Sequence, residues 1–268
     1  MKKLAKDTVL GILLGVILFA YAIFSSTDNY LMFLSLPSLL MVIGGTVAGT
    51  FISFKFTDIK SAFRELRGIF VPEKINPESL YKEVKNIITW ARILKMDGLQ
   101  GLEKEIERVK ITDPFVKYGG ELIVTGYKGD ELRKMLTNFA ETTYERNITG
   151  SYILKTMATF APGFGMLGTV IGLIIMLDKM DGNPEALGKG LAFALMTTLY
   201  GVFFANLLFK PAAEKAKQKQ ETMRLRNLLV TEGFVLLGEN KDSILIQDML
   251  NSFMDSSFHF SVIKRDEL

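Results

Sequence analysis

Two long uncharged segments in the second half of this chain constrain its fold more than any other feature. Residues 156–177 and 190–209 contain no Asp, Glu, Lys, Arg or His, and neither do residues 8–27 and 30–54 near the N-terminus. A helix rises about 1.5 Å per residue, so each segment is long enough to cross a hydrocarbon core of about 30 Å. The sequence therefore predicts an all-α polytopic membrane protein with four transmembrane helices, at about residues 8–26, 34–54, 154–177 and 188–209.

The overall composition agrees with a membrane protein that carries a polar part elsewhere in the chain. Mean hydropathy is +0.24 and 49% of the residues are hydrophobic, yet 23% are charged. The formal net charge of +3 is too small to indicate a nucleic-acid partner. With no cysteine, the chain has neither a disulfide framework nor a thiolate metal site.

The positions of Lys and Arg predict how the chain is oriented. The segment 25–34 has no Lys or Arg, and in 178–189 the two lysines are balanced by three acidic residues, whereas 55–155 and the residues after 210 are rich in both cations. Because positive loops stay cytoplasmic, we expect both termini and the middle segment in the cytoplasm. The expected parts are a transmembrane hairpin (1–54), a helical cytoplasmic domain (55–153), a second hairpin that lines an ion path (154–209) and a cytoplasmic helix with a tail (210–268).

The polar segments are also predicted to be helical. Apolar spacing and Pro or Gly breaks predict helices at about 58–70, 77–94, 99–109 and 130–149, the last of which continues into the third span. Another helix begins at Pro114, with Asp113 as its N-cap. After the fourth span we expect an amphipathic helix, 211–237, whose buried stripe comprises Leu225, Leu228, Leu229 and Phe234.

The last two spans carry small and hydroxyl-bearing residues in their middles, which a simple anchor does not need. Thr169, Thr197 and Thr198 lie there among five glycines (Gly163, Gly165, Gly168, Gly172 and Gly201). Small residues let helix backbones approach closely, and hydroxyls offer ligands to an ion. The alternative is that each threonine bonds only a carbonyl of its own helix. No Walker loop, nucleophile elbow, carboxylate pair or metal-ligand spacing is present, so we do not expect an enzyme.

Several motifs resemble those of the MotA/PomA family of flagellar stator proteins. The run Pro162-Gly163-Phe164-Gly165-Met166-Leu167-Gly168-Thr169-Val170-Ile171-Gly172-Leu173 is similar to that family's third span. The resemblance continues through the segments Leu195–Gly201, Ala205-Asn206, Lys210-Pro211, Val42–Thr46 and Asp113–Phe115. It covers essentially the whole chain in the family's order of spans and loops.

The resemblance implies an ion-driven torque generator in a bacterial inner membrane. Such subunits are expected to form a homo-oligomeric ring, a pentamer, around a MotB-type single-span partner whose aspartate carries the ion, and to push on the rotor protein FliG. No cofactor is implied beyond the transported Na⁺ or H⁺. The residues themselves also point to a partner, since none of the four spans holds an Asp, Glu, Lys, Arg or His that could carry a cation near the midplane.

The resemblance also assigns roles to residues of the ion path. Thr169 and Thr198 match the hydroxyls nearest the ion, with Thr197 beside them, so a transient Na⁺ site is expected near Thr169 and Thr198. Proton-driven members tend to have a small apolar residue in place of Thr169, which favours Na⁺ over H⁺. Ser35 departs from the sodium-type pattern, because some members have an acidic residue there. Pro162 and Pro211 match prolines that suit a hinge, although simple helix punctuation is the alternative.

In the cytoplasmic loop, the family's rotor-contacting charges correspond to Glu103 and Lys95. The next position, often basic in the family, is Met96 here, and Arg92 lies one turn before Lys95. The alternative is that these charges only solvate a helix face. Two other functions remain open: a TolQ/ExbB-like energiser, which usually has three spans and a periplasmic N-terminus, and a membrane scaffold that conducts no ion.

Overall fold

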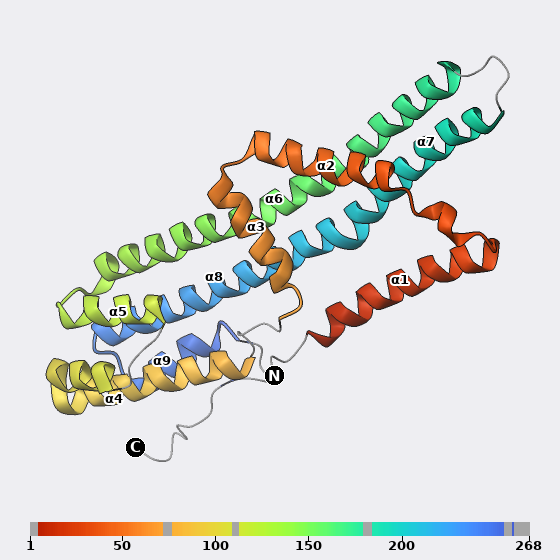
Figure 1. The fold of residues 1–268 in the computed structure, drawn as a ribbon. Coiled ribbons are helices and arrows are strands. Elements are labelled where there is room, and N and C mark those ends of the chain that lie inside the picture. Colours follow the sequence, from red (N-terminus) through yellow and green to blue (C-terminus); the bar gives the residue numbers. More distant parts are fainter. Residues whose placement is uncertain (1–4, 72–76, 109–112, 179–183, 255–258, 260–268) are drawn as a thin grey trace. The chain divides into compact units, whose positions relative to one another are not determined.

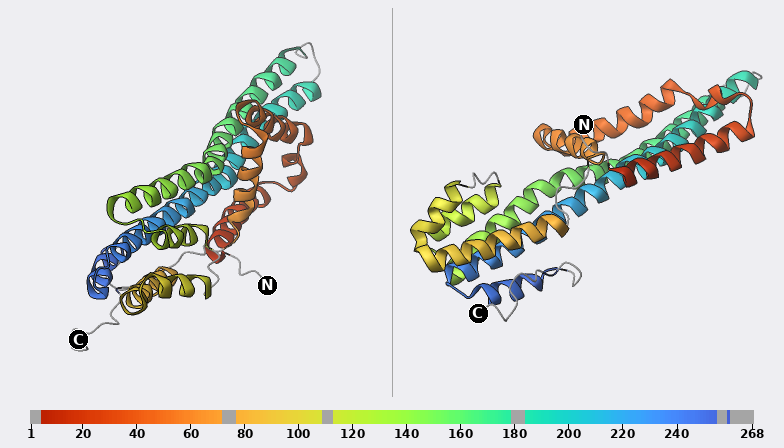
Figure 2. Two further views of the ribbon diagram at one scale, coloured as in Figure 1. Left: turned by 90° about the vertical axis from the view of Figure 1, so that its left-hand side faces the viewer. Right: turned by 90° about the horizontal axis from the view of Figure 1, so that it is seen from below.

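The computed structural model describes residues 5–71, 77–108, 113–178, 184–254 and 259, and within these ranges the chain is helical and has no strand (Figures 1 and 2). The elements are α1 (Lys6–Ser26), the 3₁₀ turn η1 (Tyr30–Phe33), α2 (Leu36–Ser53), α3 (Phe56–Gly68), α4 (Pro77–Arg108), α5 (Pro114–Val124), α6 (Gly129–Asp178), α7 (Pro184–Phe204), the π-helical turn η2 (Ala205–Phe209), α8 (Lys210–Gly238) and α9 (Ser243–Asn251).

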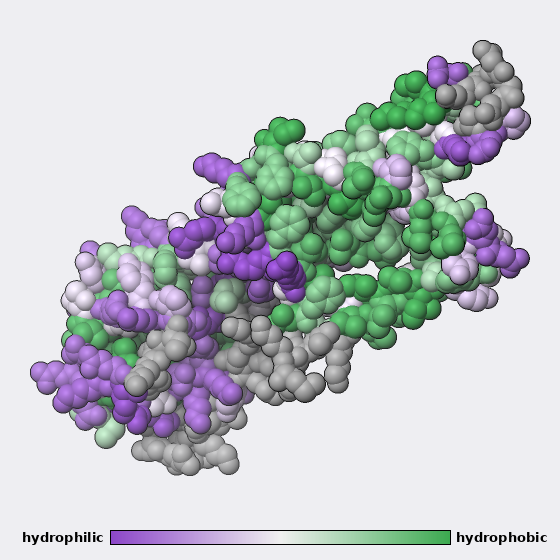
Figure 3. Space-filling model, in the orientation of Figure 1, coloured by the Kyte–Doolittle hydropathy of each residue, from purple (hydrophilic) through white to green (hydrophobic). Residues whose placement is uncertain are grey.

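Four helices are long and apolar enough to cross a membrane, which confirms the predicted all-α fold with four spans. They are Thr8–Ser26, Tyr30–Ser53, the apolar part of Gly129–Asp178 and that of Leu187–Gly238. Their outward side chains are large and apolar: Leu10, Ile17 and Ile174 are each about 60% exposed (61%, 59% and 59%). The surface view shows this as a broad hydrophobic area over the apolar helices (Figure 3). Such side chains are stable in contact with lipid.

The chain forms two compact units. The first comprises residues 1–72 and 148–218, and the second comprises residues 73–147 and 219–268. The long helices α6 and α8 therefore each contribute residues to both units. By its contacts α3 belongs to the first unit, together with the apolar helices, although it follows the second span in the sequence.

In the first unit, α2 packs against α6 through glycines. Phe164 fills the space beside Gly45, where an added Cβ would lie 2.2 Å from the ring, and Phe160 lies against Gly49. Val42 and Ala161 are fully buried in the same cluster. A Cβ at Gly45 would displace the Phe164 ring, and one at Gly49 would require Phe160 to shift by a few tenths of an ångström, so the glycines favour this pairing of helix faces.

The start of α2 is tied to α7 by one tyrosine. The Tyr200 hydroxyl donates a hydrogen bond to the carbonyl of Phe33 (2.6 Å) and accepts one from the amide of Ser35 (2.9 Å). The Ser35 side chain accepts from the amide of Ser38 (3.4 Å) and so caps α2. At this position Ser35 therefore has a structural role as a cap.

In the second unit, the predicted break between two helices occurs at Gly98. Its φ of 67° and ψ of −166° interrupt α4, and no heavy atom lies within 4 Å of the position that a Cβ would take. A left-handed φ is readily adopted by glycine because it lacks a Cβ. The core beside α4 contains Trp90 and Phe234, whose rings stack at 5.9 Å between centroids.

One part of the predicted buried stripe of α8 is wrong. Leu229 and Phe234 are buried as expected, but Leu225 is 47% exposed. The next two residues, Arg226 and Asn227, are buried instead, at 4% and 3% exposure. With 3.6 residues per turn, Arg226 and Asn227 lie about 100° and 200° around the helix from Leu225, so the buried face of α8 is turned away from that leucine.

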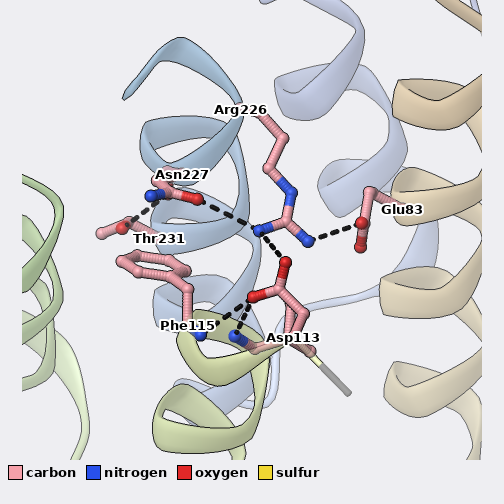
Figure 4. Close-up of polar contacts among 7 residues, drawn as sticks. Glu83, Asp113, Phe115, Arg226, Asn227 and Thr231 are labelled. Carbon is pink, nitrogen blue, oxygen red and sulfur yellow. Dashed lines mark hydrogen bonds and ion pairs between the residues drawn. The ribbon is translucent and has the colours of Figure 1, made fainter. Parts of the chain in front are cut away.

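Arg226 is stabilised in this core by three polar partners from different segments (Figure 4). Its guanidinium pairs with Glu83 of α4 at 2.5 Å and with Asp113 at 2.9 Å, and it donates to the Asn227 side-chain oxygen at 3.0 Å. The other carboxylate oxygen of Asp113 accepts from the amides of Phe115 (2.8 Å) and Val116 (3.1 Å). Asp113 is therefore both the predicted N-cap of α5 and a counter-ion of α8.

We predict that Asp113→Ala destabilises the second unit by about 2–4 kcal/mol, because it removes a helix cap and leaves Arg226 with one of its two counter-ions. Hydrogen exchange of the α5 amides, measured in the intact protein, should accelerate. Asp130→Ala is the matched control: Asp130 is exposed in the first turn of α6 and should contribute about 1 kcal/mol or less. Equal effects of the two substitutions would contradict the dual role of Asp113.

Candidate functional site

The helices α6 and α7 approach each other closely because glycines line their contact. A Cβ on Gly165 would lie 2.9 Å from the carbonyl oxygen of Thr197, and one on Gly172 would lie 2.7 Å from that of Gly190. Since real Cβ atoms do not approach a backbone so closely, glycine is required at both positions. The contact between α6 and α7 is called the glycine seam below. Close backbone approach of this kind holds apolar helices together in lipid.

Thr169 and Thr198 meet across the glycine seam, as the sequence predicts for two residues on facing spans. Their hydroxyl oxygens are 2.5 Å apart. The Thr169 oxygen also lies 3.1 Å from the carbonyl oxygen of Gly165 in its own helix and 3.2 Å from that of Ala194 in α7. Thr169 is half-buried and Thr198 is exposed. Two hydroxyl oxygens and two carbonyl oxygens therefore gather in an otherwise apolar segment.

Thr197 lies apart from this pair. It is fully buried, and its hydroxyl donates to carbonyl oxygens of its own helix, those of Phe193 (3.1 Å) and Ala194 (2.9 Å). Its side chain fills the space beside Gly168. In this structure Thr197 packs the seam, and the hydroxyls that meet across it are those of Thr169 and Thr198.

The two prolines have different surroundings. Helix α6 continues through Pro162 without interruption, and the Cα of Pro162 lies at the seam, 3.1 Å from where a Cβ of Gly201 would be. Pro211 follows the π-helical turn η2, in which the amide of Lys210 donates to the carbonyl of Ala205 five residues earlier. Because Pro211 has no N–H for the carbonyl four residues before it, a widened turn accommodates it. The π-helical turn η2 was not predicted from the sequence, although Pro211 indicates a departure from regular helix just before it.

The three predicted rotor-contact residues, Arg92, Lys95 and Glu103, are exposed on α4, on either side of the break at Gly98. Lys95 forms an ion pair with Asp242 at 2.7 Å. The hydrogen bond from Lys95, and then its charge, hold the pKa of Asp242 below the ordinary value. Sequence reasoning missed Asp242, which lies 147 positions away from Lys95.

Glu103 lies at a hollow of about 570 Å³ between α4 and α5. The hollow is lined by further charged side chains, among them Glu107, Lys117 and Glu121. Lys95 and Glu103 thus take part in separate local arrangements on the second unit. Among the described residues, no group of three or more His, Asp or Glu side chains is arranged to hold a metal ion.

Comparisons with known proteins place this geometry in context. Residues 107–227 match the MotA/TolQ/ExbB proton channel family. The chain is 31% identical to the uncharacterised protein YtxD of Bacillus subtilis over 94% of this chain and 92% of that protein. It is 28% identical to the chemotaxis protein PomA of Vibrio alginolyticus, with 92% and 94% covered. Its fold is similar to a chain of the flagellar MotAB stator complex of Bacillus subtilis, with a TM-score of 0.82, 28% identity, and 93% and 96% covered.

The glycine seam predicts a clear difference between two glycine-to-alanine substitutions. Gly201→Ala should destabilise the protein by about 1–3 kcal/mol, because its Cβ would lie 2.7 Å from the backbone oxygen of Ala161. Gly163→Ala is the matched control, since no atom lies within 4 Å of its Cβ position and alanine favours a helix. Thermal unfolding of the purified protein compares the two. A Gly201→Ala variant as stable as wild type would contradict the requirement for glycine at this contact between α6 and α7.

Proposed function

Since the chain belongs to the MotA/TolQ/ExbB proton channel family, we propose that it is the MotA-type subunit of a flagellar stator, which couples ion flow across the bacterial inner membrane to torque on the rotor. The contact between Thr169 and Thr198 carries this proposal. Polar groups inside a membrane-spanning region are costly unless they are paired or used. Here two hydroxyls from different spans meet at one point of the seam, where an ion can exchange its water for protein oxygens.

A second chain has to supply the charge in this proposal. The uncharged segments 8–27, 30–54, 156–177 and 190–209 offer only neutral oxygens, so a carboxylate for the moving cation comes from a MotB-type partner. The B. subtilis structure similar to this chain is a MotAB stator complex, which supports such a partner. A pentameric ring, contact with FliG and cytoplasmic termini complete the proposal; the distribution of Lys and Arg supports the orientation.

The Thr169 hydroxyl favours Na⁺ over H⁺ as the coupling ion. Sodium requires several oxygen ligands to replace its hydration shell, whereas a proton needs only one acceptor. The oxygens of Thr169 and Thr198, with the carbonyl oxygens of Gly165 and Ala194 beside them, offer such ligands. A small apolar side chain in place of Thr169 would leave the site one oxygen short.

A TolQ/ExbB-like energiser is the second candidate, because the matching family includes those proteins. The four apolar helices and the similarity along 93% of the chain to a flagellar stator chain favour the stator. A reporter fused to the N-terminus separates the two candidates, since the stator requires a cytoplasmic signal. A periplasmic signal would contradict the proposed orientation.

The proposed function predicts rotation that depends on sodium. In cells whose only stator is this chain with its native partner, tethered-cell rotation should rise and saturate with Na⁺ at a fixed proton-motive force. Rotation that does not depend on Na⁺ but is abolished by a protonophore would contradict sodium coupling and remain consistent with a stator. Absence of rotation in an assembled membrane complex would reject the stator function.

The same assay tests Thr169. Thr169→Ala should raise the half-saturating Na⁺ concentration about tenfold or more, because a charged ligand loses one oxygen partner. Thr169→Ser retains the hydroxyl and is the matched control, with a curve close to wild type. Equal shifts for Ala and Ser would assign Thr169 a packing role.

The rotor contact gives a separate prediction for Glu103. Glu103→Lys should reduce torque several-fold and leave the membrane complex assembled, since an exposed interfacial charge controls steering and register. Glu131→Lys is the matched control, because it reverses an exposed charge at the start of α6. Motors that contain this variant should rotate normally. Torque comes from bead rotation, and assembly from the elution volume of the purified complex. Loss of assembly in the Glu103 variant would contradict the contact assignment.

A further inference from the structure

Helix α3, which follows α2 after only two residues, exposes a face that is unusual for a helix beside water. Figure 1 shows it turning sharply away from the direction of α2. Its inner face is conventional, because Ile59 and Ala62 are 2% and 1% exposed and pack in the first unit. The two carboxylates of the helix, Asp58 and Glu65, are half-buried. With 3.6 residues per turn, both lie about 180–200° around the helix from Phe56, so the opposite, outer face is free of acidic side chains.

Aromatic and cationic residues share this outer face. Phe56 and Phe63 are 69% and 39% exposed, and Lys60, Arg64 and Arg67 are exposed as well. With 3.6 residues per turn, the two phenylalanines lie about 20° apart around the helix, and the three cations lie within about 80° on one side of Phe56. This set of five side chains is called the outer face of α3 below. Exposed phenylalanine beside water is unfavourable, so the pattern calls for an apolar neighbour.

The cations of the outer face are available for a ligand. None of the ion pairs in the described part of the chain involves Lys60, Arg64 or Arg67. In the surface view, hydrophilic and hydrophobic residues lie side by side over α3 (Figure 3). A helix with cations next to aromatic residues is typical of the boundary between lipid headgroups and acyl chains.

A hollow connects this face with the end of the second span. Its volume is about 740 Å³, and its lining includes Phe51 of α2 together with the whole outer face of α3. The rings of Phe51 and Phe56 stack at 6.2 Å between centroids. The apolar surface of the span thus continues into the aromatic lining of the hollow, and the three cations belong to the same lining.

We propose that this hollow binds an anionic phospholipid. The phosphate-bearing headgroup contacts Lys60, Arg64 and Arg67, and the upper acyl chain lies on Phe51, Phe56 and Phe63. Three arguments favour this occupant: continuity with a membrane-spanning helix, unpaired cations that complement an anion, and phenylalanines that need an apolar contact. The inference goes beyond the ion-coupling function and depends only on the chain lying in a membrane.

The test uses the full chain with its native partner in nanodiscs. Spin-labelled phosphatidylglycerol and phosphatidylcholine report how strongly each lipid associates with the protein. We expect a preference for phosphatidylglycerol that falls about fivefold or more in the variant Lys60→Gln, Arg64→Gln, Arg67→Gln, since each cation near a lipid surface contributes about fivefold. The matched control, Lys82→Gln, Lys85→Gln, Lys134→Gln, removes the same charge from exposed positions of α4 and α6 and should retain the preference.

A second measurement asks what covers the outer face. Phe63→Trp adds a fluorophore there, and Trp90, the single native tryptophan, is 4% exposed in the core of the second unit. Phosphatidylcholine brominated high on its acyl chain should quench the new tryptophan and leave the wild-type signal unchanged.

Two results would overturn the proposal. The first is equal association of both lipids with wild type, or an unchanged preference in the triple variant, since either outcome removes the role of the cations. The second is an unquenched Phe63→Trp signal, which would mean that protein, such as a neighbouring subunit, covers this face in place of lipid.

Discussion

The glycine seam between α6 and α7 is the contact on which the candidate ion site depends. Apolar helices in lipid gain little from burying apolar surface against each other, so their association relies on close packing of backbones. Gly165 and Gly172 allow that approach. Because the backbones are close, the hydroxyls of Thr169 and Thr198 come to 2.5 Å from each other. A side chain at Gly165 or Gly172 would push the two backbones apart and separate these oxygens, so the polar site depends on the packing.

The second unit depends on a buried arginine whose charge is balanced by nearby carboxylates. A buried guanidinium is unfavourable unless it is paired and hydrogen-bonded, and Arg226 meets both conditions through Glu83, Asp113 and Asn227. An apolar residue in its place would pack against any apolar neighbour, because apolar contacts are not directional. The arginine instead joins the first part of α4 and the start of α5 to α8, through its ion pairs with Glu83 and Asp113.

The sequence was most predictive where the structure depends on local chemistry. Four uncharged segments predicted the four spans. Gly98 indicated the break in α4, and Asp113 with Pro114 indicated the start of α5. Each of these features follows from a few adjacent residues and a short-range rule about helix length, backbone freedom or capping.

Features that need distant partners could not be predicted in the same way. Apolar spacing chose Leu225 for the core of α8, but the adjacent Arg226 is buried because carboxylates more than a hundred positions away are brought to it. For the same reason Lys95 gave no sign of its pairing with Asp242. The meeting of Thr169 and Thr198 lies between these cases: facing spans were expected, but the register that joins these hydroxyls depends on the whole glycine seam.

The carbonyl oxygens around the threonine pair explain how neutral groups could alternate between an empty and an occupied site under the proposed function. To bind a cation, both hydroxyl oxygens must direct lone pairs at it, so their hydrogens must point elsewhere. Thr169 has the carbonyl oxygens of Gly165 and Ala194 within 3.2 Å, and these can accept its hydrogen. When the cation leaves, the two hydroxyls can return to each other. Because the chain's own spans hold no carboxylate, the proposed partner supplies the charge that attracts the cation, and these neutral oxygens supply the ligands that replace its water.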